Sequence, residues 1–595
     1  MAIPRRPFGQ ALADGLVFLA FVLVPVAASP WGLDQFTSVK WHVLEAMSVA
    51  WFSVERLLCG SAGWPAFVRR TRLVWLALGA FVLLGSLRRG FGWALEPLLA
   101  RACFLLLALS SFWRFRRVGL RLTALRAGMG TAAAIVIALG LAQAGGLRPL
   151  PWLTAGDQRS ATFGNVNMAA EFLGLALVVL LSWRGGGEIS SRRPSLSALV
   201  EILVAGGLAY LYLLGTRSAM LGLGGALLFL AGAGRLPTRP LLRAAAAAAL
   251  LVVFVFRPGP RELVGPGMQA WKRDSAELRL AVWVDTLRLV RDRPFGVGAG
   301  NFEHAFLPYA LAGRSRPDES LVFRSPHNDV LRLLAEEGWI AAAILLGLLW
   351  LLVLRLRRSP AADSWRSPPG LLLGSLGVFL ATQACFQFPS EMASPALTTA
   401  VLLGLAWACL EPPAPAARGF VARRPVGRLA GGAVSLLVPI GILWGLGRVA
   451  TAEHLFVTAR DVVSAQEQAC RLDPRRLDAC VQAAWLRIRA GDERRARTGL
   501  VRVLDRSPCY YPAIKLLGED SLARSDRDTG CWYLGIYDEM FRKRSSVHER
   551  VQRDCPSGDP EALRVSVPRP PCPVFPLAPA DAALRPPAAP RPGGR

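Results

Sequence analysis

The chain has few charged residues and very few histidines for its length. Only 19% of its 595 residues are charged, and five are histidine. A soluble protein of this size would show amphipathic periods. Here apolar blocks of about 17–25 residues, the length that spans a bilayer, recur along most of the chain. The sequence therefore predicts an all-α, polytopic helical membrane protein.

Several familiar site patterns are missing from the sequence. It has no Walker loop, no Ser-His-Asp pattern and no Cys-x-x-Cys pair, which disfavours nucleotide-hydrolysing, serine-hydrolase and zinc sites. The glycines at 296, 298 and 300 follow no buried strand, so they indicate a tight turn or a close backbone approach and not a dinucleotide site. No acidic pair in the outer loops suits a metal ion. We therefore expect no metal and no cofactor.

The net charge of +27 would fit a nucleic-acid-binding protein, but the positions of the arginines argue against this class. They gather in every second short loop between apolar blocks, as the positive-inside rule requires. The arginine-rich loops lie near 69–72, 114–117, 184–193, 235–243, 355–358 and 418–428. We therefore place these loops and the N-terminus in the cytoplasm, and we expect no nucleic acid partner.

Thirteen spans are predicted, of which the second is weak because it contains His42, Glu45 and Glu55. They lie near 12–28, 39–58, 73–87, 93–113, 122–145, 167–183, 197–214, 218–234, 241–256, 336–354, 370–388, 394–410 and 429–449. The first block has the length and flanks of a signal peptide, but similar blocks follow it, so we expect it to stay uncleaved. This topology puts the long loop 257–326, and everything after the last span, outside the cytoplasm.

The chain divides into a membrane domain at 1–449, a helical domain at 450–555 and a tail rich in Pro and Ala at 556–595 that we expect to be disordered. Within the helical domain, Pro474 and Pro508 are 34 residues apart, the period of tetratricopeptide helix pairs. The segment resembles two degenerate tetratricopeptide repeats, which would bind a protein partner. A small helical cap without a partner explains the pattern equally well.

The ten cysteines fall into two groups. Cys59, Cys103, Cys385 and Cys409 lie in or at the ends of apolar spans, where we expect them to pack. The other six lie after residue 450, and an even number outside the cytoplasm indicates disulfides, although the pairing cannot be read from the sequence.

His327 is the main catalytic candidate. It stands in a polar segment, R-S-P-H-N-D, directly before the chain re-enters the membrane. An exposed imidazole there, with an ordinary pKa near 6.5, would accept a proton from a hydroxyl. The competing interpretation is a helix cap formed by Ser325, Asn328 or Asp329, which needs no histidine.

Arginines and asparagines near the same side of the membrane are the binding candidates. Arg217 lies in a very short loop, G-T-R-S-A, and either grips phosphate or reaches to lipid headgroups. Arg279 and Arg288 flank an apolar stripe, Leu280, Trp283, Val284, Leu287 and Val290, that predicts a helix in the membrane interface. Asn165 and Asn167, at the start of the sixth span, either cap it or contact a sugar.

Taken in order, these segments resemble the O-antigen ligase and O-antigen polymerase family of bacterial membrane glycosyltransferases. The matching motifs are N-V-N-M-A-A, G-T-R-S-A, R-L-A-V-W, P-F-G-V-G-A-G-N-F and H-N-D-V-L-R-L-L-A-E-E-G-W, within roughly residues 12–410. The resemblance implies an inverting, metal-independent enzyme of the bacterial inner membrane that uses an undecaprenyl-pyrophosphate-linked glycan. It implies that His327 activates the acceptor hydroxyl and that Arg217 and Arg279 hold the pyrophosphate, with Arg288, Asn328, Asn165 and Asn167 as supporting residues.

The acceptor stays open at this point. Lipid A core, a growing glycan and a protein all fit the motifs, with ligase-type transfer slightly favoured. A transporter of lipid-linked glycans would show buried mid-membrane charges and internal symmetry, which the sequence does not show. A passive scaffold that recruits partners through its tail is the other non-enzyme alternative.

Overall fold

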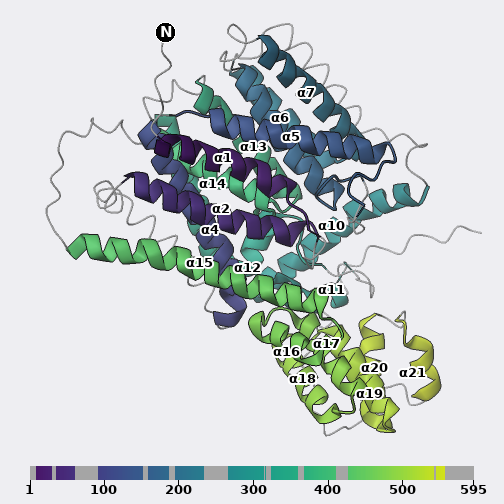
Figure 1. Ribbon diagram of the computed structural model, residues 1–595. Coiled ribbons are helices and arrows are strands. Elements are labelled where there is room, and N and C mark those ends of the chain that lie inside the picture. The colour runs from purple at the N-terminus through teal and green to yellow at the C-terminus, as the bar shows by residue number, and fades with distance from the viewer. Residues whose placement is uncertain are drawn as a thin grey trace, which may run out of the picture.

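The computed structural model describes residues 8–29, 35–59, 91–118, 120–151, 159–185, 194–233, 266–313, 315, 323–358, 367–410, 426–541 and 545–555. Within these ranges the chain forms helices and no strand, which confirms the all-α prediction (Figure 1). The predicted spans near 73–87 and 241–256 and the Pro-rich segment 556–595 lie outside the described residues.

Each of the other eleven predicted spans coincides with a helix. These are α1 (Phe8–Val26), α2 (Thr37–Cys59), α4 (Phe91–Val118), α5 (Thr123–Ala144), α6 (Val166–Gly185), α7 (Pro194–Leu214), α8 (Arg217–Gly232), α12 (Asp329–Arg358), α13 (Pro368–Phe386), α14 (Ala393–Leu410) and α15 (Val426–Thr458). Seven of them, α1, α5, α6, α7, α12, α13 and α14, are long and apolar enough to cross a membrane, and α8 is a shorter apolar helix. The chain is a polytopic membrane protein.

The charges that make α2 a weak span are paired. Near its C-terminal end, Glu55 accepts from Arg117 at 2.7 Å. Near its N-terminal end, the His42 ring contacts Glu453 of α15 at 3.2 Å. Because its charged side chains have partners on neighbouring helices, α2 packs into the bundle although it is less apolar than the other spans.

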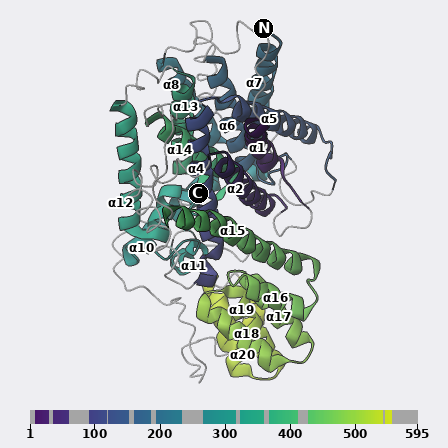
Figure 2. The ribbon, with the colours of Figure 1, turned by 60° about the vertical axis from the view of Figure 1, so that its left-hand side comes forward.

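α6 and α14 are the most buried of the seven apolar spans, and α12 is the least buried. Of the most apolar stretch of α6, 72% is buried, against 11% for α12. α13 packs against α6 and α8, and α14 packs against α4. Figure 2 shows α12 at the edge of the bundle, with α10 near one of its ends. A helix so little covered by protein presents most of its apolar surface to lipid.

The long loop between α8 and α12 is largely helical. It contains α10 (Pro266–Asp292) and α11 (Phe302–Ala312), which pack against each other. The predicted interfacial stripe on α10 is only partly correct: Leu280 and Leu287 are exposed, whereas Val290 is buried. The buried face contains Asp285 and Leu289, because this side of α10 packs against α11 and α12 and not against lipid.

The helical domain extends from the end of α15, as Figure 1 shows. It consists of α16 (Val463–Leu472), α17 (Leu477–Arg489), α18 (Glu493–Arg506), α19 (Tyr511–Ala523), α20 (Arg527–Met540) and α21 (His548–Asp554). α17 and α19 begin 34 residues apart, and so do α18 and α20. The predicted period thus recurs in the helix starts, while membership of the tetratricopeptide family stays a prediction.

Disulfides cross-link this domain, as predicted. Cys470 is bonded to Cys480, and Cys531 to Cys555. Among the other cysteines, Cys103 is buried as predicted, but Cys385 is exposed, because it lies in the last turn of α13 and not in its packed middle. Cys59 is at the end of α2, and its side chain lies outside the described part.

Candidate active site at the C-terminal end of α13

His327 is less exposed than the sequence suggests. Its imidazole contacts the ring of Phe388, with 5.1 Å between the ring centroids. Burial, and then the nearby charge of Arg279, lower the pKa of His327 from 6.5 to about 4. The prediction of an exposed imidazole with an ordinary pKa is therefore wrong, and the ring is neutral, able to accept a proton, over the whole physiological pH range.

His327 is also displaced from the membrane span by a short helix. α12 is broken at Gly338, whose φ of 82° and ψ of 175° are not helical. Residues 329–337 therefore form a separate short helix between His327 and the apolar span. Asn328 caps this helix: its Oδ1 accepts from the backbone N–H of Leu331 at 3.0 Å. The capping role expected for this segment is confirmed for Asn328.

Arg279, on α10, contacts the segment of chain that carries the Phe388 ring. Its Nη1 donates to the carbonyl oxygen of Phe386 at 3.3 Å. Burial lowers the pKa of Arg279, but a guanidinium stays charged in this setting. The Arg279 cation at Phe386 and the neutral His327 base at Phe388 are thus held by residues that are two positions apart in the chain.

Arg288 is placed differently. It forms an ion pair at 3.2 Å with Asp285, which is fully buried. Asp285 also accepts from the backbone N–H of Ser315 at 2.8 Å. Arg288 therefore balances a carboxylate that holds α10 to the following loop.

Arg217, Asn165 and Asn167 meet at the ends of two neighbouring helices. Asn165 caps α6, because its Oδ1 accepts from the N–H of Asn167 at 2.8 Å. The Asn167 side chain in turn accepts from Thr216, the N-cap of α8, at 3.4 Å. Arg217, the next residue, is exposed and makes no hydrogen bond or ion pair with other described residues. The two asparagines thus fix the backbone that presents a free guanidinium.

The segment Cys385–Glu391 contacts both His327 and Arg279, and nothing in the sequence pattern pointed to it. It includes the short 3-10 helix η2 (Pro389–Glu391) between α13 and α14. Its contacts are Cys385 O with Asn328 at 3.0 Å, Phe386 O with Arg279, Gln387 with Ser218 at 2.9 Å, Phe388 with His327, and Ser390 with Asp329 at 2.7 Å. Two of these contacts are made by backbone carbonyl oxygens, which any residue can supply and which therefore leave no pattern in the sequence.

A half-buried ion pair completes the segment. Arg332 contacts Glu391 at 2.7 Å and Glu336 at 3.3 Å. Burial raises the pKa of Glu391 to about 7, although Arg332 opposes this shift. The pair ties η2 to the short helix after His327. In the sequence, the ion pair could have been suspected only from the presence of a charged residue, Glu391, in an otherwise apolar stretch.

The glycine turn at 296–300 packs on the break in α12. Gly296 and Gly338 both have positive φ, and a Cβ on Gly296 would lie 2.3 Å from the carbonyl oxygen of Glu336. The backbone N–H of Gly298 donates to the same carbonyl at 2.8 Å. This confirms the predicted close backbone approach, and it explains why glycine is required here.

The helical domain reaches the other side of this turn. The Arg475 guanidinium donates to the carbonyl of Gly300 at 3.1 Å. Ser507 contacts the ring of His304, in α11, at 3.4 Å, and Leu311 of α11 belongs to the hydrophobic core of the helical domain. The domain is therefore built onto the loop that carries the site.

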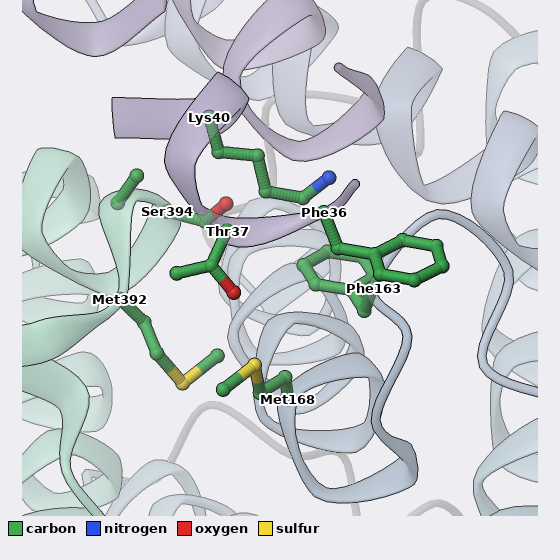
Figure 3. Close-up of a pocket in the computed structure, with 8 residues that line it drawn as sticks. Phe36, Thr37, Lys40, Phe163, Met168, Met392 and Ser394 are labelled. Atoms are coloured by element: carbon green, nitrogen blue, oxygen red, sulfur yellow. The ribbon is translucent and has the colours of Figure 1, made fainter. Parts of the chain in front are cut away.

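A small cavity lies beside the site, between the start of α2, the Phe163–Met168 segment and Met392. Figure 3 shows Lys40 extending toward Phe163, with Met168 and Met392 facing each other. Lys40 donates to the carbonyl of Thr162 at 2.7 Å. The cavity of about 10 Å³ has room for about one water molecule, so it is not a glycan site in this structure.

Among the described residues, no group of three or more His, Cys, Asp or Glu side chains is placed to hold a metal ion. Metal independence itself stays a prediction.

Part of the chain is similar to a known protein family. Residues 202–346 match the family described as O-antigen ligase. The chain carries an O-antigen ligase domain. This ligase domain contains Arg217, Arg279, Arg288, His327 and Asn328, whereas Asn165, Asn167 and the Cys385–Glu391 segment lie outside the matched range. A search of the curated proteins gave no match.

Proposed function

We propose that this protein transfers a glycan from undecaprenyl pyrophosphate to an acceptor hydroxyl on the periplasmic face of the bacterial inner membrane, as an O-antigen ligase does. One observation carries the proposal: within the ligase domain, a neutral imidazole and a guanidinium are held at Phe388 and Phe386, at the end of a membrane helix. A substrate with a lipid tail and a pyrophosphate would reach this position from the bilayer. Disulfides in the helical domain support an oxidising compartment on that side.

The residues divide the reaction between them. His327 accepts the proton of the acceptor hydroxyl as its oxygen forms a bond to the anomeric carbon of the donor. The bond from that carbon to the pyrophosphate oxygen breaks, and the electron pair leaves with undecaprenyl pyrophosphate. Arg279 and Arg217 stabilise the charge that develops there. Attack from the face opposite the leaving group inverts the anomeric centre, and pyrophosphate neutralised by arginines leaves without a metal ion.

Deleting the gene and sizing the surface glycans tests the proposal. We expect long glycan to accumulate on the lipid carrier and the lipid A core to remain bare. Core that carries a single repeat unit would identify a polymerase instead. Unchanged glycan lengths and unchanged core would reject both and would direct attention to protein acceptors.

A second experiment separates an enzyme from a transporter or a scaffold. The His327→Ala protein, expressed at the normal level, should fail to restore glycan transfer in the deletion strain. Full restoration would show that His327 is not a base. Purified wild-type protein should retain its activity in excess chelator, and activity that depends on an added divalent ion would contradict the metal-independent mechanism.

A further inference from the structure

The orientation of the His327 ring is not set by a hydrogen bond. Its Nδ1 is buried and has no hydrogen-bond partner among the described residues. In many sites the second ring nitrogen of a catalytic histidine donates to a carbonyl or a carboxylate, which fixes both the tautomer and the ring plane. The backbone of His327 and the packing around its ring must supply the orientation here.

The backbone of His327 is itself in an uncommon conformation. Its φ of 52° is in the left-handed region, which costs a residue other than glycine about 1–3 kcal/mol and persists only where the surroundings enforce it. The peptide before His327 has a specific partner. The indole Nε1 of Trp283 donates to the carbonyl oxygen of Pro326 at 2.8 Å. This bond holds the peptide unit whose orientation is linked to the φ of His327.

The same indole reaches the segment that holds the arginine. Trp283 and Phe386 have ring centroids 6.4 Å apart, and the Phe386 carbonyl accepts from Arg279. Trp283 follows Arg279 by four residues on α10, so the two side chains lie on one face of that helix. A single side chain therefore connects the peptide of the base with the residue that holds the cation.

We propose that Trp283 is the positioning residue of this site: its indole N–H, bound to the Pro326 carbonyl, holds the His327 imidazole against Phe388 and in register with Arg279. This role rests on the proposed function of His327 as the base. Trp283 does not touch the reacting atoms. It acts by fixing the peptide that sets the position of the ring, and a misplacement of about 1 Å costs roughly 100-fold in rate.

The Trp283→Phe variant tests this role, since phenylalanine keeps a ring against Phe386 but has no N–H for Pro326. Purified wild type and variant are assayed with donor and core glycolipids extracted from the deletion strain. We expect kcat to fall about 10- to 100-fold, with KM for the donor within about twofold of wild type. The matched control is Trp339→Phe, which removes an exposed indole nearby and should leave the kinetics unchanged.

A pH profile distinguishes positioning from a general loss of structure. Burial keeps the pKa of His327 at about 4, so release of the loop into water should raise it toward 6.5 and move the acid limb of kcat/KM upward. Wild-type kcat together with an unshifted acid limb in Trp283→Phe would overturn the inference. If that variant does not accumulate, Trp283→Leu, which also lacks the N–H for Pro326, replaces it, with the same expected shift and the same refuting result.

The His327→Ala variant distinguishes a failure of the proposed function from a failure of the positioning role of Trp283. An active His327→Ala enzyme would reject the proposed function itself. An inactive His327→Ala enzyme beside a fully active Trp283→Phe enzyme would reject only the positioning role.

Discussion

Replacing Arg279 by lysine should damage transfer far more than replacing Arg288 by lysine. Lysine keeps the positive charge but loses the planar fork of donors. Arg279 uses one nitrogen on the Phe386 carbonyl, which leaves its other donors for the pyrophosphate. A single ammonium group cannot reproduce both contacts in the same geometry.

The expected size follows from the contacts. A hydrogen bond to a charged group contributes about 1.5–3 kcal/mol, so losing one at the pyrophosphate should lower kcat/KM roughly 10- to 100-fold. Arg288 is paired with buried Asp285, and lysine preserves the charge that this carboxylate needs. Arg288→Lys should therefore keep its activity within about threefold of wild type and lose only some thermal stability.

The assay compares Arg279→Lys, Arg288→Lys and Arg217→Lys in detergent, with initial rates measured against donor concentration. Arg217 is exposed and has no protein partner among the described residues, so its loss should appear in transfer and not in the melting temperature. Equal and mild effects in all three variants would show that these arginines only contact lipid headgroups. A large effect of Arg288→Lys alone would show that Arg288, and not Arg279 or Arg217, contacts the pyrophosphate.

Four further outcomes are expected. Because burial lowers the pKa of His327 to about 4, the base stays unprotonated as pH falls from 7 to 5, and kcat/KM should be lost only near pH 4, whereas an acid limb at 6.5 would contradict this. Gly296→Ala should abolish transfer, since its Cβ would meet the Glu336 carbonyl, while Gly347→Ala, with open space around it, should be active. Arg475→Ala, which removes the contact to Gly300, should lower kcat severalfold at unchanged expression, and wild-type kinetics would show that the helical domain does not support the site. Reporter fusions after residues 358 and 490 should report cytoplasm and periplasm respectively, and the same compartment for both would refute the topology.

Most of the fold could be predicted from the sequence because lipid imposes a simple requirement. A run of about 20 apolar residues must satisfy its own backbone, so each predicted span within the described residues is a helix, most of them with bounds close to the prediction. The break at Gly338 was harder to see, because helical periodicity continues through it. It depends on a contact with Gly296, more than forty residues earlier in the chain, and no local pattern records that contact.

The site could be predicted only in part. His327, Asn328 and the arginines stand out as side chains of a suitable type in loops. The surroundings that modify them do not stand out. The low pKa of His327 comes from burial against a loop far along the chain, and Val290, expected to face lipid on α10, is buried in protein. Carbonyl oxygens from Pro326, Cys385 and Phe386 hold the site together, and any residue can supply a carbonyl.

The role of Cys385–Glu391 explains why the order of the motifs along the chain is informative. Ser218, Arg279, His327 and Asn328 come from three parts of the chain, yet each contacts this one segment. Because several distant residues must reach this one segment, the order and spacing of the helices that carry them are constrained. The identities of the residues within the segment are constrained less. Substitutions that keep the backbone of 385–391 in place should therefore be tolerated where the side chain makes none of these contacts. The exposed Cys385, which contributes only its carbonyl, is the position where a change to serine should leave transfer intact.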